Sequence, residues 1–340
     1  MEYKTTDKAT GAPAVDVIIP SYNGLPYLKE TIASVLAQTH KDFILYVVDD
    51  GSTDKGATKK YVEGINDPRV KYIHKENGGQ STARNQGIKL SSSPYVTMLD
   101  SDDIWYPAKL KQQLDCFARQ PSVGLVYGYS KLIDATGKFI KPVAYDKRGW
   151  LFKYLLRGNK ISGSGSMVMI KREVFDKVGL FHEDFLIGED WEMWLRIAHD
   201  YEIECVPEFL VGIRVLDTGM QQNHLKIARG LDYMLPIMVK EFKLGLVDKA
   251  VLGTTCLRQA CVLYFKGGDR KSARKALFAM LRYNPLAMLS MEPKDWLICV
   301  QFLIGNRWLR SIRRKLSASY RQREAQAASS LDRKNHDTNS

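Results

Sequence analysis

Short apolar runs alternate with amphipathic segments through the first hundred residues of the chain. Four runs of five or six residues, rich in Val, Ile and Tyr, predict strands at 15–20, 43–48, 70–74 and 95–99. Two helices are predicted between them: 25–37 carries apolar residues at helical spacing, and 81–90 follows a Gly-Gly turn and begins with capping hydroxyls. Continuous apolar strands joined by helices indicate an α/β fold whose mostly parallel central sheet is flanked by helices on both faces.

The second half of the chain has a different pattern. Further strands are predicted at 167–170, 203–206 and 209–213, and a helix over 188–198 would bury Trp194 and Ile197 and present acids at its start. Residues 255–285 show small and apolar residues at helical spacing around Gly267-Gly268, which predicts one helical hairpin of tetratricopeptide character. We therefore divide the chain into a flexible N-terminus, a globular domain, a basic helical extension and a disordered tail, at 1–13, 14–220, 221–324 and 325–340.

Charge separates the two halves further. Residues 221–340 contain 22 Lys and Arg against 9 Asp and Glu, while residues 1–220 contain 28 against 29, so the net charge of +12 is C-terminal. The segment 306–323 holds seven of these cations, no acid and one apolar helical stripe, which is typical of a helix on an anionic membrane surface. A solvated helix that packs one face on the domain is the alternative. Nucleic acid is not an expected partner, because no recognition motif accompanies the cations.

Cysteine usage and hydropathy bear on the compartment. The five cysteines are scattered without Cys-x-x-Cys spacing, which indicates neither a disulfide framework nor a zinc site. The first residues lack the apolar core of a signal peptide, and no run approaches 18 apolar residues. We expect a cytoplasmic protein, either free or peripheral on the inner face of the cell membrane.

Acidic residues gather where two of the predicted strands end. Asp49 and Asp50 follow the second strand, and Asp100, Asp102 and Asp103 follow the fourth. Ligands of parallel sheets bind beyond the carboxyl ends of the strands, and carboxylates this close repel one another unless a cation neutralises them. Their oxygens suit Mg²⁺ or Mn²⁺ but are too few to fill a coordination shell, so substrate phosphates would share the metal.

Structural roles are the alternative for these acids. Asp103 could cap a helix over 104–117, with Pro107 near its first turn. The segment 49–54 could be a tight turn capped by Ser52 or Thr53, although this does not explain two adjacent acids.

Two segments resemble nucleotide-binding motifs, but each lacks a residue that its motif requires. Residues 51–56 have P-loop glycine spacing and Thr58 follows, but Ala57 stands where the motif requires Lys. The run SGSGS at 162–166 lacks the third glycine of a dinucleotide fingerprint, and a flexible turn or a loop near an acceptor explains it equally well. An NTPase and a dehydrogenase are therefore not expected.

Five motifs follow one another in an order that resembles the inverting family 2 glycosyltransferases of GT-A fold. They read VDVIIPSYN (15–23), YVVDDGSTD (46–54), ENGGQSTARNQGI (76–88), YVTMLDSDDIWYP (95–107) and GEDWEMWLRIA (188–198), and together cover roughly Val15 to Arg214. The resemblance implies transfer of a sugar from a nucleotide-diphosphate donor, expected to be a UDP-sugar, to a hydroxyl of a glycan or lipid-linked acceptor. It also implies inversion, Mn²⁺ or Mg²⁺, and a role in cell-surface polysaccharide or glycolipid synthesis.

The resemblance assigns roles to single residues. Tyr22 would stack on the base, Asp50 would accept hydrogen bonds from it, and Asp102 would bind the metal. The whole expected donor-binding set is Pro20, Ser21, Tyr22, Asn23, Asp50, Arg84, Asp100 and Ser101. A plain strand-to-helix turn would also explain 21–23, and a solvated helix charge would explain Arg84.

Asp190 is the expected general base, taking the proton of the acceptor hydroxyl as its oxygen attacks the anomeric carbon. Acids that stabilise a helix N-terminus are the alternative, which would cover Glu189 equally well. Arg214 is a further expected site residue. Relatives often have a histidine shortly after this arginine, but the chain reads RVLD here, which leaves any third metal ligand unidentified, and His224 lies too far along.

Two other functions remain open at this point. A haloacid-dehalogenase-like phosphatase also presents Asp-x-Asp at the end of an apolar strand, with the first acid as nucleophile. It leaves the other four motifs unexplained. A non-catalytic scaffold that binds sugar nucleotides would need neither Asp102 nor Asp190.

Overall fold

The structure, a computed structural model, describes residues 15–161, 165–185, 187–216, 223–293, 295, 296 and 299. Contacts divide the chain into two units. The first consists of Met1–Leu151, Lys160–Asp184 and Met193–Arg214, and the second of Phe152–Asn159, Phe185–Glu192 and Val215–Ser340. The predicted segments 1–13, 306–323 and 325–340 lie outside the described residues.

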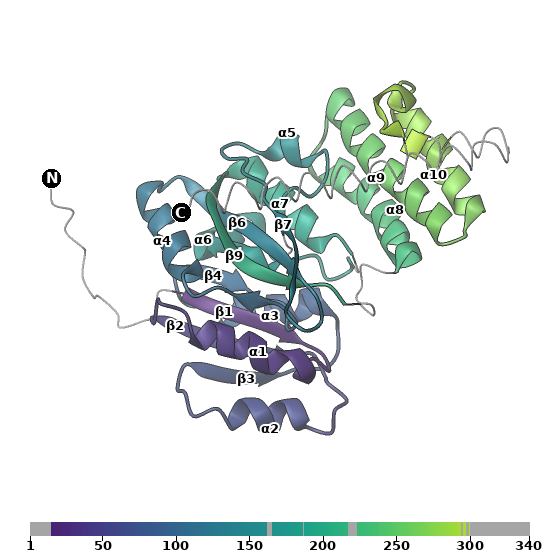
Figure 1. Ribbon diagram of the computed structural model, residues 1–340. Helices are drawn as coiled ribbons and strands as arrows, with labels where there is room; N and C mark the ends of the chain where they lie inside the picture. The colour runs from purple at the N-terminus through teal and green to yellow at the C-terminus, as the bar shows by residue number, and fades with distance from the viewer. Residues whose placement is uncertain are drawn as a thin grey trace, which may run out of the picture. The chain divides into compact units, whose positions relative to one another are not determined.

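The first unit begins with alternating strands and helices (Figure 1). These are β1 (Val15–Ser21), α1 (Leu25–Leu36), β2 (Phe43–Asp49), α2 (Ala57–Glu63), β3 (Val70–His74), α3 (Gln80–Leu90) and β4 (Tyr95–Met98). The four strands are parallel in the order β3-β2-β1-β4. β1 is buried along its whole length, because it is central in this group and α3 packs against it. Every predicted strand of this region is confirmed within one residue.

The rest of the first unit continues the same sheet with mixed pairing. The elements are β5 (Ile104–Trp105), α4 (Lys109–Arg119), β6 (Val123–Ile133), β7 (Phe139–Val143), η1 (Gly165–Met167), β8 (Met169–Lys171), α6 (Arg172–Val178), α7 (Glu189–Asp200, which begins in the second unit) and β9 (Glu202–Arg214). The described residues form a nine-stranded sheet in the order β3-β2-β1-β4-β8-β6-β9-β5, with β7 on β6. β8 is antiparallel to β4 and β6, while β6 and β9 are parallel.

The predicted helix over 104–117 is wrong at its start. Ile104 and Trp105 form the short strand β5, which pairs with Gly212 and Val211 of β9. The helix α4 begins only at Lys109. The cause is a pairing with residues a hundred positions away, which local helical spacing cannot reveal.

The second unit is helical in the described part of the chain. It contains α5 (Phe152–Leu155), the first turn of α7, α8 (His224–Glu241), α9 (Leu246–Lys266), α10 (Arg270–Tyr283) and η3 (Ala287–Ser290). α9 and α10 form the predicted hairpin around Gly267-Gly268, and α8 packs on α9 (Figure 1). No described helix is both long and apolar enough to cross a bilayer.

The second unit also holds two segments that the sequence placed in the globular domain. Phe152 packs on Phe242, which follows α8, at a ring distance of 5.3 Å, and Phe185 on Tyr233 of α8 at 5.9 Å. A side chain at Gly188 would meet Met234 Sδ at 3.0 Å. Residues 152–159 and 185–192 therefore share a core with the C-terminal helices.

Candidate active site

Four loops meet at one edge of the sheet, beyond the carboxyl ends of β1, β2, β3 and β4. Ser21, the last residue of β1, is in register with Asp49, and Asp49 is in register with His74. β4 ends at Met98, in register with Ile18 of β1, and because all four strands are parallel, the loops that follow them lie at the same edge. The residues that the sequence analysis expects to bind the donor lie at this edge.

Asn23 ties the loop after β1 to the loop after β2. Its backbone adopts a left-handed conformation at φ 52°, which Asn tolerates better than most residues. Its backbone N–H donates to Ser52 Oγ at 2.9 Å, and its Oδ1 accepts from Thr53 N at 2.8 Å. Tyr22, next to it, has 51% of its side chain exposed and can offer a ring face to a ligand.

The loops after β1 and β4 approach each other closely at Gly24. A Cβ atom at Gly24 would lie 2.8 Å from Ser101 Oγ and 2.9 Å from Ser21 Oγ, so glycine is required there. The Ser21 hydroxyl is buried and has no hydrogen-bond partner in the described part of the chain. An unsatisfied buried hydroxyl is costly, which favours a ligand group at this position.

Asp50 is buried and organises the start of α3. Its Oδ1 accepts from Lys75 Nζ at 2.5 Å and from Gly78 N at 3.0 Å, and its Oδ2 accepts from Gly79 N at 2.7 Å. Each carboxylate oxygen has two acceptor positions, so Oδ2 retains one for a ligand. The expected contact from Asp50 to the base stays a prediction, now limited to that position.

Asp49 has a structural role in the same region. It accepts hydrogen bonds from the Tyr72 hydroxyl at 2.6 Å and from Ser52 N at 2.8 Å. The predicted cap at Ser52 or Thr53 is not found, because α2 begins at Ala57 and Asp54 accepts from Thr58 N at 2.8 Å.

Arg84 on α3 is buried and holds Asp100. Its Nη2 donates to Asp100 Oδ1 at 2.8 Å, and Gln80 Nε2 donates to the same oxygen at 2.7 Å. α3 lies so close to β1 that a Cβ atom at Gly87 would be 2.5 Å from Ile18 Cγ2. Arg84 is therefore a buried partner of residues 100–103, the acidic turn, and not a solvated helix charge.

Asp103 is buried, and its carboxylate anchors the acidic turn to Ser166 and Arg214. Its Oδ2 accepts from the Ser166 hydroxyl at 2.6 Å, and its Oδ1 accepts from Arg214 N at 2.9 Å. Ser166 Oγ also accepts from Asp100 N at 3.0 Å. The predicted helix cap at Asp103 is wrong, because α4 begins six residues later and the carboxylate serves this network. Burial, together with the negative charges of Asp102 and Asp100, raises the pKa of Asp103 well above its usual value.

Thr31 and Arg214 hold the backbone of the same turn. The Thr31 hydroxyl lies 3.0 Å from Ser101 O and 2.8 Å from Asp103 O. The Arg214 guanidinium donates to Asp102 O at 2.8 Å and to Glu30 Oε2 at 2.6 Å. Arg214 thus supports the acidic turn from β9.

Asp102 differs from its two acidic neighbours. Its carboxylate is half-buried, and within the described residues it has no hydrogen bond from, or ion pair with, any other side chain. Burial and then the negative charge of Asp100 raise the pKa of Asp102 to about 6. A divalent cation would relieve this repulsion, and hard carboxylate oxygens are suitable ligands, so the residues present fit Mg²⁺ or Mn²⁺.

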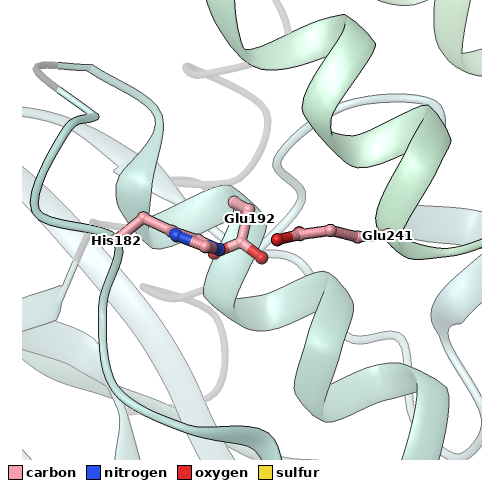
Figure 2. A group of neighbouring side chains, drawn as sticks. All are labelled: His182, Glu192 and Glu241. Carbon is pink, nitrogen blue, oxygen red and sulfur yellow. The ribbon is translucent and has the colours of Figure 1, made fainter.

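Asp190 and Glu189 lie in the first turn of α7, in the second unit. Asn159 Nδ2 donates to Asp190 Oδ2 at 3.2 Å, and Trp191 Nε1 donates to Leu155 O at 2.8 Å, which fixes this turn against residues 152–159. The expected burial of Trp194 and Ile197 is confirmed, and Trp191 is buried as well. Figure 2 shows Glu192 of the same helix and Glu241 of α8 directed toward each other, with carboxylate oxygens within 4.8 Å.

Sequence reasoning missed four residues that shape the site. Gln80 lies inside a quoted motif, and Lys75 directly follows a predicted strand, so their positions gave a usable signal. Ser166 lies in the small-residue run at 162–166, but its contact with the acidic residues gave no signal, and neither did that of Thr31, because each acts on a segment 63 to 72 residues away in the chain.

Comparison with known proteins gives a consistent family. The model of Glycosyl transferase family 2 matches residues 16–179. The Escherichia coli protein "UDP-Glc:alpha-D-GlcNAc-diphosphoundecaprenol beta-1,3-glucosyltransferase WfgD" is 32% identical over 199 residues, or 56% of this chain and 72% of that protein. The chain spans only 29% to 31% of the length of three rickettsial relatives described as uncharacterized glycosyltransferases, at 36% to 37% identity.

Two solved structures share the fold. S. aureus TarS in complex with UDP superposes with a TM-score of 0.63 at 18% identity, over 91% of each chain. Mannosyltransferase PcManGT from Pyrobaculum calidifontis, in complex with GDP-Man and Mn²⁺, gives 0.54 at 20% identity, over 87% of this chain and 88% of that one. At these identities the likeness concerns the fold.

Proposed function

The chain belongs to glycosyl transferase family 2 and has the GT-A type of fold, and we propose that it is an inverting, metal-dependent sugar transferase. The donor is a nucleotide-diphospho-sugar, with UDP as the expected nucleotide. The acceptor is a hydroxyl of a glycan or lipid-linked sugar in the synthesis of a cell-surface polysaccharide or glycolipid. Relatives named for UDP-glucose transfer to a diphosphoundecaprenol-linked sugar and for teichuronic acid synthesis support this class of acceptor.

The acidic turn at 100–103 carries the proposal. Asp100 is held by Arg84 and Gln80, and Asp103 is held by Ser166 and Arg214. These anchors leave Asp102 as the carboxylate of the turn that is not engaged by another side chain in the described part of the chain. A turn that is fixed from both sides and presents one carboxylate is suited to a metal shared with a substrate diphosphate.

Each residue then has a chemical task. Tyr22 stacks on the base, and the remaining acceptor position of Asp50 Oδ2 takes a hydrogen bond from it. Asp100 and the buried hydroxyl of Ser21 orient the ribose and phosphate groups. Asp102 would hold Mg²⁺ or Mn²⁺, which when bound stabilises the negative charge of the leaving diphosphate.

Asp190 is the proposed base. It accepts the proton of the attacking hydroxyl, and direct displacement at the anomeric carbon converts an α-linked donor into a β-linked product. Asn159 and the packing of α7 hold its carboxylate in one orientation. Glu189, one residue earlier, would add negative potential near the acceptor.

Localisation follows from the acceptor and the charge. We place the protein in the cytoplasm, peripheral on the inner face of the cell membrane, where lipid-linked acceptors would be reached. The basic segment 306–323, outside the described residues, is one proposed contact with anionic lipid.

Thermal unfolding tests the donor site without knowledge of the acceptor. The purified chain is heated with UDP, GDP, dTDP or no nucleotide, each with and without Mn²⁺, because ligands that bind the native state raise its stability. A nucleotide at about 100 times its Kd adds about 2.7 kcal/mol. We expect a Mn²⁺-dependent rise in Tm with UDP.

Two variants assign the roles. Asp102→Ala should lose the Mn²⁺-dependent part of the shift. Asp190→Asn should keep the shift and lose about 10² to 10⁴ in kcat, since it removes the base and not the donor site. A UDP shift that is unchanged in Asp102→Ala would contradict the metal role. Full turnover in Asp190→Asn would contradict the base.

A further inference from the structure

The outward face of α10 is a row of cations in the second unit. α10 buries Ala273, Ala276, Leu277 and Met280 against its neighbours. Its opposite face exposes Arg270, Lys271, Arg274, Lys275 and Arg282, and the helix contains no acid. None of these five cations forms an ion pair in the part of the chain that the structure describes.

Apolar side chains accompany these cations. Phe278 is exposed within the row and lies under the guanidinium of Arg274, with 5.6 Å from Cζ to the ring centroid. Beyond the end of α10, Leu286 and Leu289 have 67% and 82% of their side chains exposed.

The start of α9 contributes to the same apolar end. α9 and α10 are antiparallel neighbours, and Gly253 of α9 lies against the Tyr283 ring, so the start of α9 and the end of α10 lie at the same end of the hairpin (Figure 1). Leu246 and Val247 there are 87% and 76% exposed. Such exposure of four large aliphatic side chains at one end is unusual for a solvated surface.

We propose that the α9–α10 hairpin docks on an anionic lipid bilayer. The cations of α10 contact lipid phosphates, and the apolar end, formed by Leu246, Val247, Leu286 and Leu289, enters the boundary between headgroups and acyl chains. Binding to a membrane surface grows with the apolar area that is buried and with the attraction of cations to anionic lipid, and this hairpin offers both. The surface is distinct from the segment 306–323 and its lipid binding does not depend on sugar transfer.

Charge and apolarity select this occupant over others. The chain's own segment 306–323 carries seven cations and no acid, so it does not complement α10 electrostatically. A second copy of the hairpin would oppose one cationic face with another. A nucleic acid would match the cations but would leave the four aliphatic side chains in water.

Vesicle co-sedimentation of the full chain tests the surface. The lipids are phosphatidylcholine alone, or phosphatidylcholine with about 30% phosphatidylglycerol as the anionic component. The test variant is Lys271→Gln/Arg274→Gln/Lys275→Gln, and the apolar variant is Leu286→Ser/Leu289→Ser. The matched control, Lys59→Gln/Lys60→Gln/Lys89→Gln, removes three exposed cations from α2 and α3 of the first unit.

The chain should bind the anionic vesicles and not the neutral ones. Each cation near such a surface contributes about fivefold, so the α10 variant should lower the partition coefficient on the order of 100-fold. The apolar variant should weaken binding also at high salt, where the electrostatic part is screened. The control should bind like the wild type.

Several outcomes would overturn the proposal. The first is that the chain does not bind vesicles. The second is that the control variant loses as much vesicle binding as the α10 variant. The third is that the α10 variant binds vesicles fully while Arg310→Gln/Arg313→Gln/Arg314→Gln loses vesicle binding. Binding of a short DNA duplex without vesicle binding would replace lipid with nucleic acid. A dimer in light scattering that Leu286→Ser/Leu289→Ser dissociates, with vesicle binding unchanged, would assign the apolar end to a second copy.

Discussion

Ser166 joins two parts of the acidic turn through one hydroxyl group. It donates to Asp103 and accepts from the backbone of Asp100, and its own carbonyl accepts from Trp105 Nε1 at 2.9 Å. The side chains of Ser166 and Asp103 are both buried, so the Asp103 carboxylate oxygen cannot turn to water instead. The position of the turn therefore depends on this residue.

Ser166→Ala should destabilise the protein by about 1–3 kcal/mol, because it leaves a buried carboxylate oxygen of Asp103 and the backbone N–H of Asp100 without their partner. It should also reduce the Mn²⁺-dependent shift with UDP. Ser93→Ala is the control, since Ser93 is equally buried and its hydroxyl has no partner among the described residues. Urea unfolding of both variants measures the difference. Equal effects of the two changes would contradict the role of Ser166.

The acidic turn shows what the sequence could and could not reveal at the level of residues. The grouping of Asp50, Arg84 and Asp100 was predictable, because each follows a strand or begins a helix at one sheet edge. The different contacts of Asp100, Asp102 and Asp103 could not be predicted from the sequence. They depend on Ser166 and Arg214, which are 63 and 111 residues from Asp103.

Elements that are local in sequence were predicted well. The parallel strands are buried on both faces and therefore appear as continuous apolar runs, which fixes their limits within one residue. The strand β5 was missed because its two residues gain their pairing from β9. The hairpin of α9 and α10 was predictable from the two glycines of its turn. In the structure, Asp269 accepts a hydrogen bond from Ser272 N at 3.0 Å at the start of α10.

The close packing of α3 on β1 makes Gly87 sensitive to any side chain. Gly87→Ala would place Cβ against Ile18 and push α3 from the sheet, at an expected cost of about 1–3 kcal/mol. Because Arg84 and Gln80 move with the helix, the UDP shift should fall as well. Gly245→Ala is the control: its φ is −69° and no atom lies within 4 Å, so the added Cβ meets no clash, and replacing the glycine at the N-cap of α9 should cost only about 0.5 kcal/mol. A neutral Gly87→Ala in the same thermal unfolding experiment would refute the close contact.

Lys109 at the start of α4 predicts a dependence of stability on pH. It is fully buried, donates to Thr97 Oγ1 and Gln113 Oε1 at 2.9 Å, and burial lowers its pKa well below the usual value of a lysine. Between that lowered pKa and about 10.4, the unfolded chain binds a proton that the native chain does not, so stability rises with pH.

The stability of the wild type relative to Lys109→Met should therefore increase by up to about 1.4 kcal/mol for each pH unit in that window. Urea unfolding between about pH 7 and 9.5 measures this slope. Lys111→Met, on the exposed side of the same helix, should show no such slope relative to the wild type. A stability difference for Lys109→Met that stays constant across the range would mean that Lys109 is charged in the native state.

The family model ends at residue 179, whereas the first unit of this protein continues to Arg214. No single point of the chain divides the two units, because segments of the second unit interrupt the first. Residues 152–159 and 185–192 leave the first unit and pack with the C-terminal helices, as Phe185 does on Tyr233. The proposed base Asp190 lies in one of these segments. The helical part is thus expected to stabilise the segment that carries the proposed base.

Truncation after Leu216 tests this dependence at the level of the whole molecule. The shortened chain would expose Phe185 and the other apolar residues of 152–159 and 185–192 that the C-terminal helices cover. We therefore expect a low soluble yield and a Tm reduced by several degrees. Each kcal/mol of lost stability corresponds to about 2–4 °C in a chain of this size. Truncation after Glu324 removes only 16 residues and should leave Tm and the UDP shift unchanged. If the chain ending at Leu216 unfolds cooperatively at the wild-type Tm and retains full turnover, residues 185–192 do not need the helices, and the helical part would serve membrane docking alone.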